Sequence, residues 1–327
     1  MKKTYLVTGA AGFIGSQFVR SCSPLGVSVI SVDHESHFKQ RTENQDVCFG
    51  QIIDREQLFT WLGEHRPQLA GIIHLGAITD TRVTDIERLK HFNLEFSKSI
   101  WNFSVQNKVP LVYASSAATY GDGSQGYSDD ETHISKLRPL NPYGDSKQQF
   151  DLWALGQQAL GNAPPQWAGF KFFNVYGFGE RHKGFMSSVV LKAFDEIQEK
   201  NQVTLFKSHH KDIPDGFQKR DFIFVGDVVQ AIHFALNHPI RRGIFNLGTG
   251  QARTFLDLSR SVFQALGRTE KICFLDTPLS IRDKYQYFTQ AEMAKLRAQD
   301  PKQEQLPAFT SLEEGVAQYV KRLSSSG

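Results

Sequence analysis

Short apolar runs alternate with longer stretches of helical periodicity along most of the chain, and the runs show no polar alternation. A strand that is apolar at every position is buried on both faces, as in a parallel sheet covered by helices on each side. Strands that alternate with helices indicate βαβ units. The sequence therefore predicts an α/β protein with a doubly wound parallel sheet, whose strands we expect at residues 5–8, 27–32, 71–75, 109–114 and 169–173.

The helix expected around residues 92–105 has apolar residues on two faces. One face is needed to cover the sheet. The second carries Leu94, Trp101 and Val105. Because a leftover apolar face favours association with another subunit, we expect a homo-oligomer.

Beyond about residue 175 the pattern is less regular, with short apolar runs at 203–206, 222–225 and 244–247 between helices. We interpret residues 1–175 as a sheet domain, with returning segments near 217–250. Residues 176–327 then form a smaller, interleaved C-terminal α/β domain. Such a division predicts a cofactor in the first domain and a substrate in the second.

The composition is that of an ordinary globular chain: 327 residues, 40% hydrophobic and 22% charged, with a net charge of +3. This excess is too small to indicate a nucleic-acid partner or a membrane surface. Cys22, Cys48 and Cys273 form no C-x-x-C pair, and the adjacent His209 and His210 stand in no ligand cluster, so we expect neither disulfides nor a metal site. Without a long apolar segment or a secretory signal, we expect a cytoplasmic location.

Three glycines, Gly9, Gly12 and Gly15, follow the first expected strand and precede a helix. A turn this tight needs glycine where the backbone takes φ > 0, approaches a pyrophosphate or packs closely on the helix. The start of the helix offers free N–H groups and the positive end of its dipole. The segment therefore predicts a dinucleotide site.

The charges after the second strand leave the form of the dinucleotide open. Asp33 ends this strand, where a carboxylate accepts hydrogen bonds from the adenosine ribose and favours NAD. Cationic partners for a 2′-phosphate, which favour NADP, follow at His34, Lys39, Arg41 and Arg55.

A second constellation joins Ser116, at the end of the strand expected at 109–114, with Tyr143 and Lys147. Tyr143 and Lys147 are one helical turn apart. A tyrosine with a pKa of about 10 is a poor base at neutral pH, but an ammonium group and an oxidised nicotinamide both stabilise its phenolate. We therefore expect Tyr143 to take a proton from a substrate hydroxyl that Ser116 also holds.

In this chain order, the glycine turn, the serine and the Tyr-x-x-x-Lys pair resemble the extended short-chain dehydrogenase/reductase family. The resemblance implies a Rossmann-like fold and hydride transfer at a nicotinamide. The residues that we expect to bind the cofactor are Gly9, Gly12, Phe13, Ile14, Gly15, Asp33, His34, Lys39, Arg55, Leu75, Gly76, Ala77, Ile78, Thr79, Asn93, Tyr143, Lys147, Val175 and Lys183.

Segments in the second half resemble one subgroup of this family, the epimerases of ADP-activated heptoses. The most specific are His182-Lys183-Gly184 and the pair of segments Tyr285-Gln286 and Phe288-Thr289-Gln290-Ala291. The resemblance implies a tightly bound NADP, inversion at C6 of the heptose and a place in lipopolysaccharide precursor synthesis. It also implies that Tyr143 and Lys183 transfer protons on opposite sides of the carbonyl.

The same resemblance implies substrate contacts by Ser116, Asn174, Phe185, Lys192, Phe206, Arg220 and Tyr285. Phe185 and Lys192 stand where the family often has serine and histidine, which leaves their contacts open. Arg220 offers a planar fork for a diphosphate, unless it pairs with Asp221 or Asp227.

Two other functions stay open. The first is another nucleotide-sugar 4-epimerase or a dehydratase, although Ala117 and Ala118 stand where a dehydratase usually has acidic groups beside Ser116. The second is a non-catalytic dinucleotide sensor. A sensor does not need catalytic residues, whereas this chain contains Ser116, Tyr143, Lys147 and Lys183 together.

Overall fold

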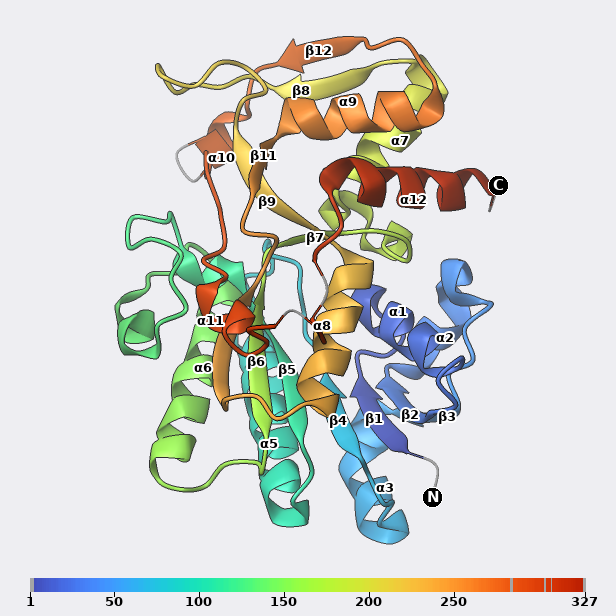
Figure 1. The fold of residues 1–327 in the computed structure, drawn as a ribbon, viewed down its shortest axis with the longest axis vertical. Coiled ribbons are helices and arrows are strands. Elements are labelled where there is room, and N and C mark those ends of the chain that lie inside the picture. The colour runs from blue at the N-terminus through green and yellow to red at the C-terminus, as the bar shows by residue number, and fades with distance from the viewer. Residues whose placement is uncertain (1–2, 283–284, 303, 307, 326–327) are drawn as a thin grey trace.

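A seven-stranded parallel sheet is the main feature of the computed structural model, which describes residues 3–282, 285–302, 304–306 and 308–325 (Figure 1). Every neighbouring pair of strands in this sheet is parallel. The strand order reverses between β1 and β4, where open sheets bind ligands at the carboxyl ends. In spatial order the strands are β10 (Gly243–Leu247), β6 (Trp167–Phe172), β5 (Leu111–Ser116), β4 (Gly71–His74), β1 (Thr4–Thr8), β2 (Ser28–Asp33) and β3 (Gln51–Asp54).

Helices cover both faces of the sheet. One face packs on α1 (Phe13–Cys22) and α8 (Val225–Asn237). The other packs on α3 (Leu58–His65), α5 (Phe96–Asn107) and α6 (Pro142–Ala159). Along β1, Tyr5 and Val7 belong to the first core and Leu6 to the second, which is why the strand is apolar at successive positions.

The predicted doubly wound, Rossmann-like α/β fold is confirmed. The five expected strands are β1, β2, β4, β5 and β6, and the sheet contains two more. β3 is an edge strand with exposed residues, so its apolar signal is weak. β10 is fully buried, but an apolar run does not show which other strand it will pair with.

A second part of the molecule lies above the carboxyl ends of this sheet (Figure 1). It has a three-stranded sheet of β11 (Ala252–Thr254), β9 (Lys219–Phe224) and β7 (Asn174–Tyr176), and a two-stranded sheet of β12 (Ile272–Leu275) and β8 (Val203–Phe206). A separate core joins these strands to α7 (Val189–Lys200), α9 (Phe255–Leu266) and α12 (Leu312–Ser325). Short helices are α2 (Glu35–Gln40), α4 (Ile86–Leu89), α10 (Leu279–Arg282) and α11 (Ala294–Arg297). The domain boundary after residue 175 stays a prediction.

The second apolar face of α5 is used within the chain. Trp101 is fully buried, and its indole N–H donates to the carbonyl of Asn162 at 3.0 Å. Its ring meets Trp153 of α6 at 5.9 Å between centroids, and Leu94 is also buried. The face on which we based a homo-oligomer is therefore covered by α6, and it gives the oligomer no support.

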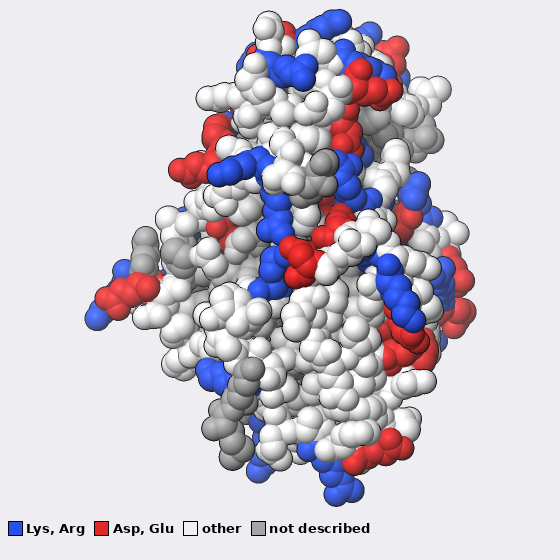
Figure 2. Space-filling view, turned by 90° about the vertical axis from the view of Figure 1, so that its right-hand side faces the viewer, with Lys and Arg blue, Asp and Glu red and all other residues white. Residues whose placement is uncertain are grey.

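The surface charges and the composition give little further information about the fold. Basic and acidic side chains are interspersed on the face seen in Figure 2, so the net charge of +3 forms no single basic patch there. In the part of the chain that the structure describes, no helix has the length and apolar character to cross a bilayer. The same residues contain no His, Cys, Asp and Glu group suited to a metal ion.

Candidate active site

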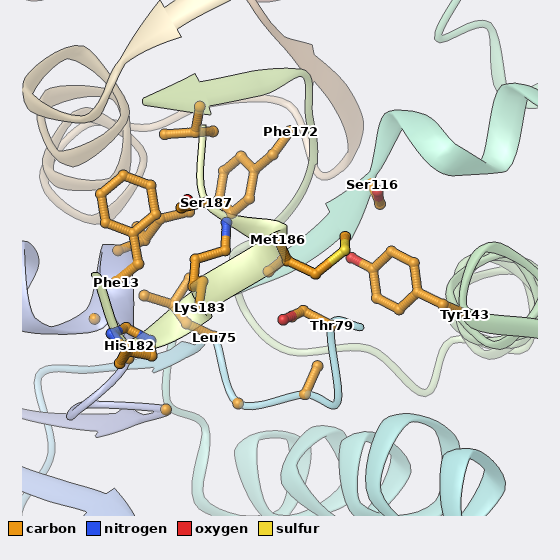
Figure 3. Close-up of a pocket in the computed structure, with 18 of the residues that line it drawn as sticks. Phe13, Leu75, Thr79, Ser116, Tyr143, Phe172, His182, Lys183, Met186 and Ser187 are labelled. Atoms are coloured by element: carbon orange, nitrogen blue, oxygen red, sulfur yellow. The ribbon is translucent and has the colours of Figure 1, made fainter. Parts of the chain in front are cut away.

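A cavity of about 500 Å³ opens at the carboxyl ends of the sheet, beside the point where the strand order reverses (Figure 3). Its volume is that of a small-molecule site. The wall brings together the turn after β1, the ends of β2 and β5, the start of α6 and the segment before α7. The predicted site residues that line it are Gly9, Gly12, Phe13, Ile14, Gly15, Asp33, Arg55, Leu75, Gly76, Ala77, Thr79, Ser116, Tyr143, Lys147, Asn174, Val175 and Lys183.

The glycine turn forms one end of the cavity, and its shape excludes side chains. Gly9 has φ +68°, and a Cβ there would lie 2.6 Å from the backbone nitrogen of Gly76. A Cβ on Gly15 would collide with the carbonyl oxygen of Gly9. No side chain caps α1 at Gly12, so the first N–H groups of this helix face the cavity without a capping partner. This end suits an anion.

Asp33 closes the turn from β2. Its carboxylate accepts hydrogen bonds from the backbone N–H groups of Ala11 (3.1 Å) and His34 (2.8 Å), and it lies 2.8 Å from Nδ1 of His37. Burial opposes ionisation, but the contact with His37 and the nearby Arg41 outweigh it and hold the pKa of Asp33 below its ordinary value. The carboxylate is therefore anionic and already engaged on both oxygens.

Two arginines supply positive charge at this end, beside His37. Arg41 has its Nη1 3.9 Å from Asp33, and Arg55 lies 4.0 Å from the ring centroid of Phe92. Both arginines and His37 line the cavity. An anionic ligand that extends beyond a pyrophosphate would therefore meet the guanidinium groups of Arg41 and Arg55, in addition to the N–H groups at the start of α1.

Tyr143 and Lys147 come from the first turns of α6, which Asn141 caps by accepting a hydrogen bond from the N–H of Gly144 (2.8 Å). The Lys147 ammonium donates to the carbonyl of Ala114 at 2.9 Å, and burial lowers the pKa of this lysine to about 8. Burial raises the pKa of Tyr143, although a hydrogen bond with Ser116 acts in the opposite direction. A phenolate at neutral pH therefore needs a further positive group in the cavity.

A fully buried ion pair lies behind these groups. Lys171 and Asp151 are each 0% exposed, with 2.6 Å between Nζ and Oδ2. Ser115 donates to the same carboxylate at 2.6 Å, and Lys171 donates to Thr119 at 2.7 Å. Because Ser115 precedes Ser116 and Asp151 lies one helical turn after Lys147, this network fixes the strand end that carries Ser116 and the helix that carries Lys147.

Lys183 enters the cavity from the opposite wall, on the short helix η6 (Arg181–Met186). Figure 3 shows Lys183 and Tyr143 approaching from different sides, with Met186 between them. The Lys183 Nζ lies 5.3 Å from the ring centroid of Phe13, and burial lowers its pKa, an effect that the buried Glu180 opposes. A lysine with a lowered pKa gives up its proton more readily than a free lysine, which suits a group that transfers protons.

Other predicted site residues do not line the cavity, namely His34, Lys39, Ile78, Asn93, Phe185, Lys192, Phe206, Arg220 and Tyr285. Asn93 supports the wall from behind, because its side-chain amide bonds to both the N–H (2.8 Å) and the carbonyl (3.0 Å) of Ile78. Lys39 pairs with Glu35 on the surface at 2.6 Å. Phe185 is 69% exposed, with Lys192 4.8 Å from its ring centroid.

Arg220 lies at the start of β9 and is 9% exposed. Its guanidinium donates to the carbonyls of Lys219 (2.8 Å) and Gln286, and it lies 5.6 Å from the ring centroid of Tyr285. Asp221 and Asp227 instead accept hydrogen bonds from other segments. The sequence left open an ion pair between Arg220 and Asp221 or Asp227. The ion pairs found among the described residues do not include it.

The cavity wall also contains side chains that the sequence did not single out, including His37, Met186 and Ser187, and it contains His182, which the sequence named only as part of the segment with Lys183. His37 follows Asp33 by one helical turn, and this proximity is the signal that the sequence offered for it. Met186 and Ser187 belong to a segment whose path depends on packing and not on a motif.

His74 is buried beneath the turn at the end of β4. Its Nδ1 lies 2.6 Å from the Thr8 hydroxyl and its Nε2 lies 2.8 Å from the Ser97 hydroxyl. Thr8 in turn accepts a hydrogen bond from the N–H of Gly76 at 3.2 Å. Burial, with a smaller contribution from Lys147, lowers the pKa of His74 from 6.5 to about 3. The imidazole therefore stays neutral in the folded protein at mildly acidic pH.

This pKa predicts a loss of stability in mild acid. Between pH 7 and pH 5 the unfolded chain protonates His74 and the folded chain does not, so the free energy of unfolding falls by about 2 kcal/mol on this account. Urea unfolding at both pH values should show that His74→Gln lacks this part of the decrease, whereas the control His65→Gln, at an exposed histidine, keeps it. An identical decrease in wild type and His74→Gln would contradict the assignment.

The family model described as NAD dependent epimerase/dehydratase family matches residues 5–248. A relative from Fusobacterium nucleatum, named ADP-L-glycero-D-manno-heptose-6-epimerase, is 40% identical over 97% of this chain and 96% of its own length. A protein of the same name from Nitratidesulfovibrio vulgaris strain Hildenborough is 41% identical over 97% of each chain. The crystal structure of the Helicobacter pylori protein of that name is similar with a TM-score of 0.79 and 25% identity, covering 99% of this chain and 97% of the other.

Proposed function

The chain belongs to the NAD dependent epimerase/dehydratase family, and on that premise we propose that it inverts C6 of the heptose in ADP-D-glycero-D-manno-heptose to give ADP-L-glycero-D-manno-heptose. The product would serve lipopolysaccharide core synthesis. One observation carries the proposal: two groups able to transfer a proton, Tyr143 and Lys183, enter one cavity from different sides (Figure 3). Two relatives of about 40% identity over almost the whole chain bear the corresponding name.

The residues of the cavity fit a nicotinamide dinucleotide. The uncapped start of α1 and the side-chain-free turn at Gly9 and Gly12 suit the pyrophosphate. The raised pKa of Tyr143 calls for a positive group near the phenol, which an oxidised nicotinamide provides. We propose NADP over NAD, because Arg41 and Arg55 line the cavity and offer a 2′-phosphate two cationic partners.

When bound, the cofactor supplies reversible acceptance of a hydride from a carbinol carbon. Tyr143 takes the proton of the C6 hydroxyl, and Ser116 holds the same oxygen through its own hydroxyl. Lys147 stabilises the phenolate by its charge while its ammonium stays anchored on Ala114. The oxidised sugar is a ketone at C6. This ketone then rotates in the cavity. Lys183 gives a proton to the C6 oxygen from the side opposite Tyr143.

We propose that the nucleotide part of the substrate binds above the cavity. Arg220 is buried without a carboxylate partner among the described ion pairs, and it carries its charge beside Tyr285. We propose that it meets the diphosphate of the sugar nucleotide. Asn174, which lines the cavity at the start of β7, contacts the sugar.

Incubation of the purified chain with ADP-D-glycero-D-manno-heptose, without added cofactor, tests the proposal. We expect proton NMR to follow conversion to the L-glycero epimer, and mass spectrometry of the dinucleotide released on denaturation to give the mass of NADP. Conversion of a UDP-hexose in place of the ADP-heptose would assign the chain to another epimerase. Bound dinucleotide with no conversion of either sugar would favour a sensor.

A further inference from the structure

Glu43 links the two walls of the cavity. It lies in the short helix η1 (Thr42–Asn44), two residues after Arg41. Its carboxylate accepts hydrogen bonds from the backbone N–H groups of Arg181 (2.8 Å) and His182 (3.2 Å), and the Nδ1 of His182 lies 2.7 Å from the same carboxylate. These partners immediately precede Lys183 in the chain.

The carboxylate side of this contact is largely buried and charged. The Glu43 side chain is 9% exposed and the His182 side chain 18%, although Arg181 and His182 as whole residues lie at the surface. Burial opposes ionisation of Glu43, but the hydrogen bonds from His182 and Arg181 outweigh it and hold its pKa below the ordinary value. An anionic carboxylate that accepts two successive N–H groups does what an N-cap side chain does for a helix. Glu180, at the N-cap of η6, makes no side-chain cap of its own.

The other side of η1 is tied to the glycine turn. Asn44 is buried, and its side chain donates to the carbonyl of Ala11 at 3.1 Å. Ala11 donates through its N–H to Asp33. A continuous series of hydrogen bonds therefore runs from Asp33 through the turn and η1 to the segment that carries Lys183.

We propose that Glu43 is a positioning residue that holds Lys183 in the cavity and couples its placement to the dinucleotide end of the site. This inference rests on the proposed function for the role of Lys183. Because the contact joins both walls, it also slows escape of the dinucleotide. Loss of the carboxylate frees the segment 181–183 and weakens both properties together.

The test compares Glu43→Ala and Glu43→Gln with Glu35→Gln, a matched control whose exposed carboxylate pairs with Lys39 in the neighbouring helix. NADPH is bound to each protein and then displaced by excess NADP⁺, while its fluorescence reports the dissociation rate. We expect dissociation to be at least about tenfold faster in Glu43→Ala, less so in Glu43→Gln, which keeps one acceptor oxygen, and unchanged in Glu35→Gln.

Steady-state kinetics on ADP-heptose give the second readout. We expect kcat to fall about tenfold or more in Glu43→Ala with KM changed by less than about threefold, because a displaced Lys183 affects the reaction more than substrate binding. Wild-type NADPH dissociation together with wild-type kcat in both Glu43 variants would overturn the inference. If the wild type binds NADPH but converts no ADP-heptose, the proposed function fails, and the dissociation rates alone still decide whether Glu43 couples the two walls.

Discussion

Tyr143→Phe is expected to lower kcat for the epimerisation by about 10²–10⁴-fold, the range that a positioned acid or base contributes. The change removes the hydroxyl that bonds to Ser116 and leaves the ring in place. The glycine turn and Asp33 are untouched, so the dinucleotide should stay bound. The measurement is kcat by NMR or a coupled assay, together with the dinucleotide content of the purified variant.

Tyr287→Phe is the matched control for this variant. Its hydroxyl accepts a hydrogen bond from the backbone of His209 at 3.4 Å and lies outside the cavity wall. We expect kcat of the control to stay within about twofold of the wild type, as is usual for substitutions away from special contacts. A Tyr143→Phe protein that retains full activity would remove Tyr143 from the chemistry and favour the sensor.

Lys171→Met is expected to destabilise the fold by about 3–5 kcal/mol, because it leaves the fully buried carboxylate of Asp151 without its cation. In Lys171→Met with Asp151→Asn no charge is buried. The amide oxygen accepts from one of the two hydroxyls that now donate to Asp151, those of Tyr113 and Ser115, and the amide NH2 donates to the other. Replacement of both charges in a buried pair is often nearly neutral. We therefore expect the double variant to recover most of the lost stability.

Urea unfolding of the wild type, the single variant and the double variant measures these differences. Lys98→Met is the control, since Lys98 pairs with Glu95 near the surface and such pairs contribute less than about 1 kcal/mol. A single variant that is as stable as the control would show that Asp151 does not depend on Lys171. A double variant no more stable than the single one would point to packing and not to the unpaired charge.

The sequence predicted the parts of the fold that depend on local pattern. The buried strands and the turn at Gly9 follow from residue types at successive positions, and the Tyr143 and Lys147 pair from helical spacing. The edge strand β3 escaped prediction, because exposed positions give an edge strand a weak apolar pattern. The second apolar face of α5 was misinterpreted, because the sequence does not reveal that Trp153 and Trp167 surround Trp101.

Contacts between distant segments account for the rest of the site. His34 and Arg41 both follow β2, but of these two only Arg41 lines the cavity, since the direction of its side chain depends on the path of α2 and η1. Glu43 looks like an ordinary loop carboxylate, and its partner His182 is 139 residues away. Such pairs arise from how the two parts of the molecule meet, which no local spacing encodes.

In the proposed mechanism, C6 is inverted by removal and return of the same hydrogen, while Tyr143 and Lys183 transfer only the hydroxyl proton. The reaction of ADP-D-glycero-D-manno-heptose in D₂O, with C6 of the product examined by NMR and mass spectrometry, tests this directly. We expect an L-glycero product that carries protium at C6, because the hydride does not exchange with solvent. Deuterium at C6 would rule out this mechanism and would show that the carbon is deprotonated.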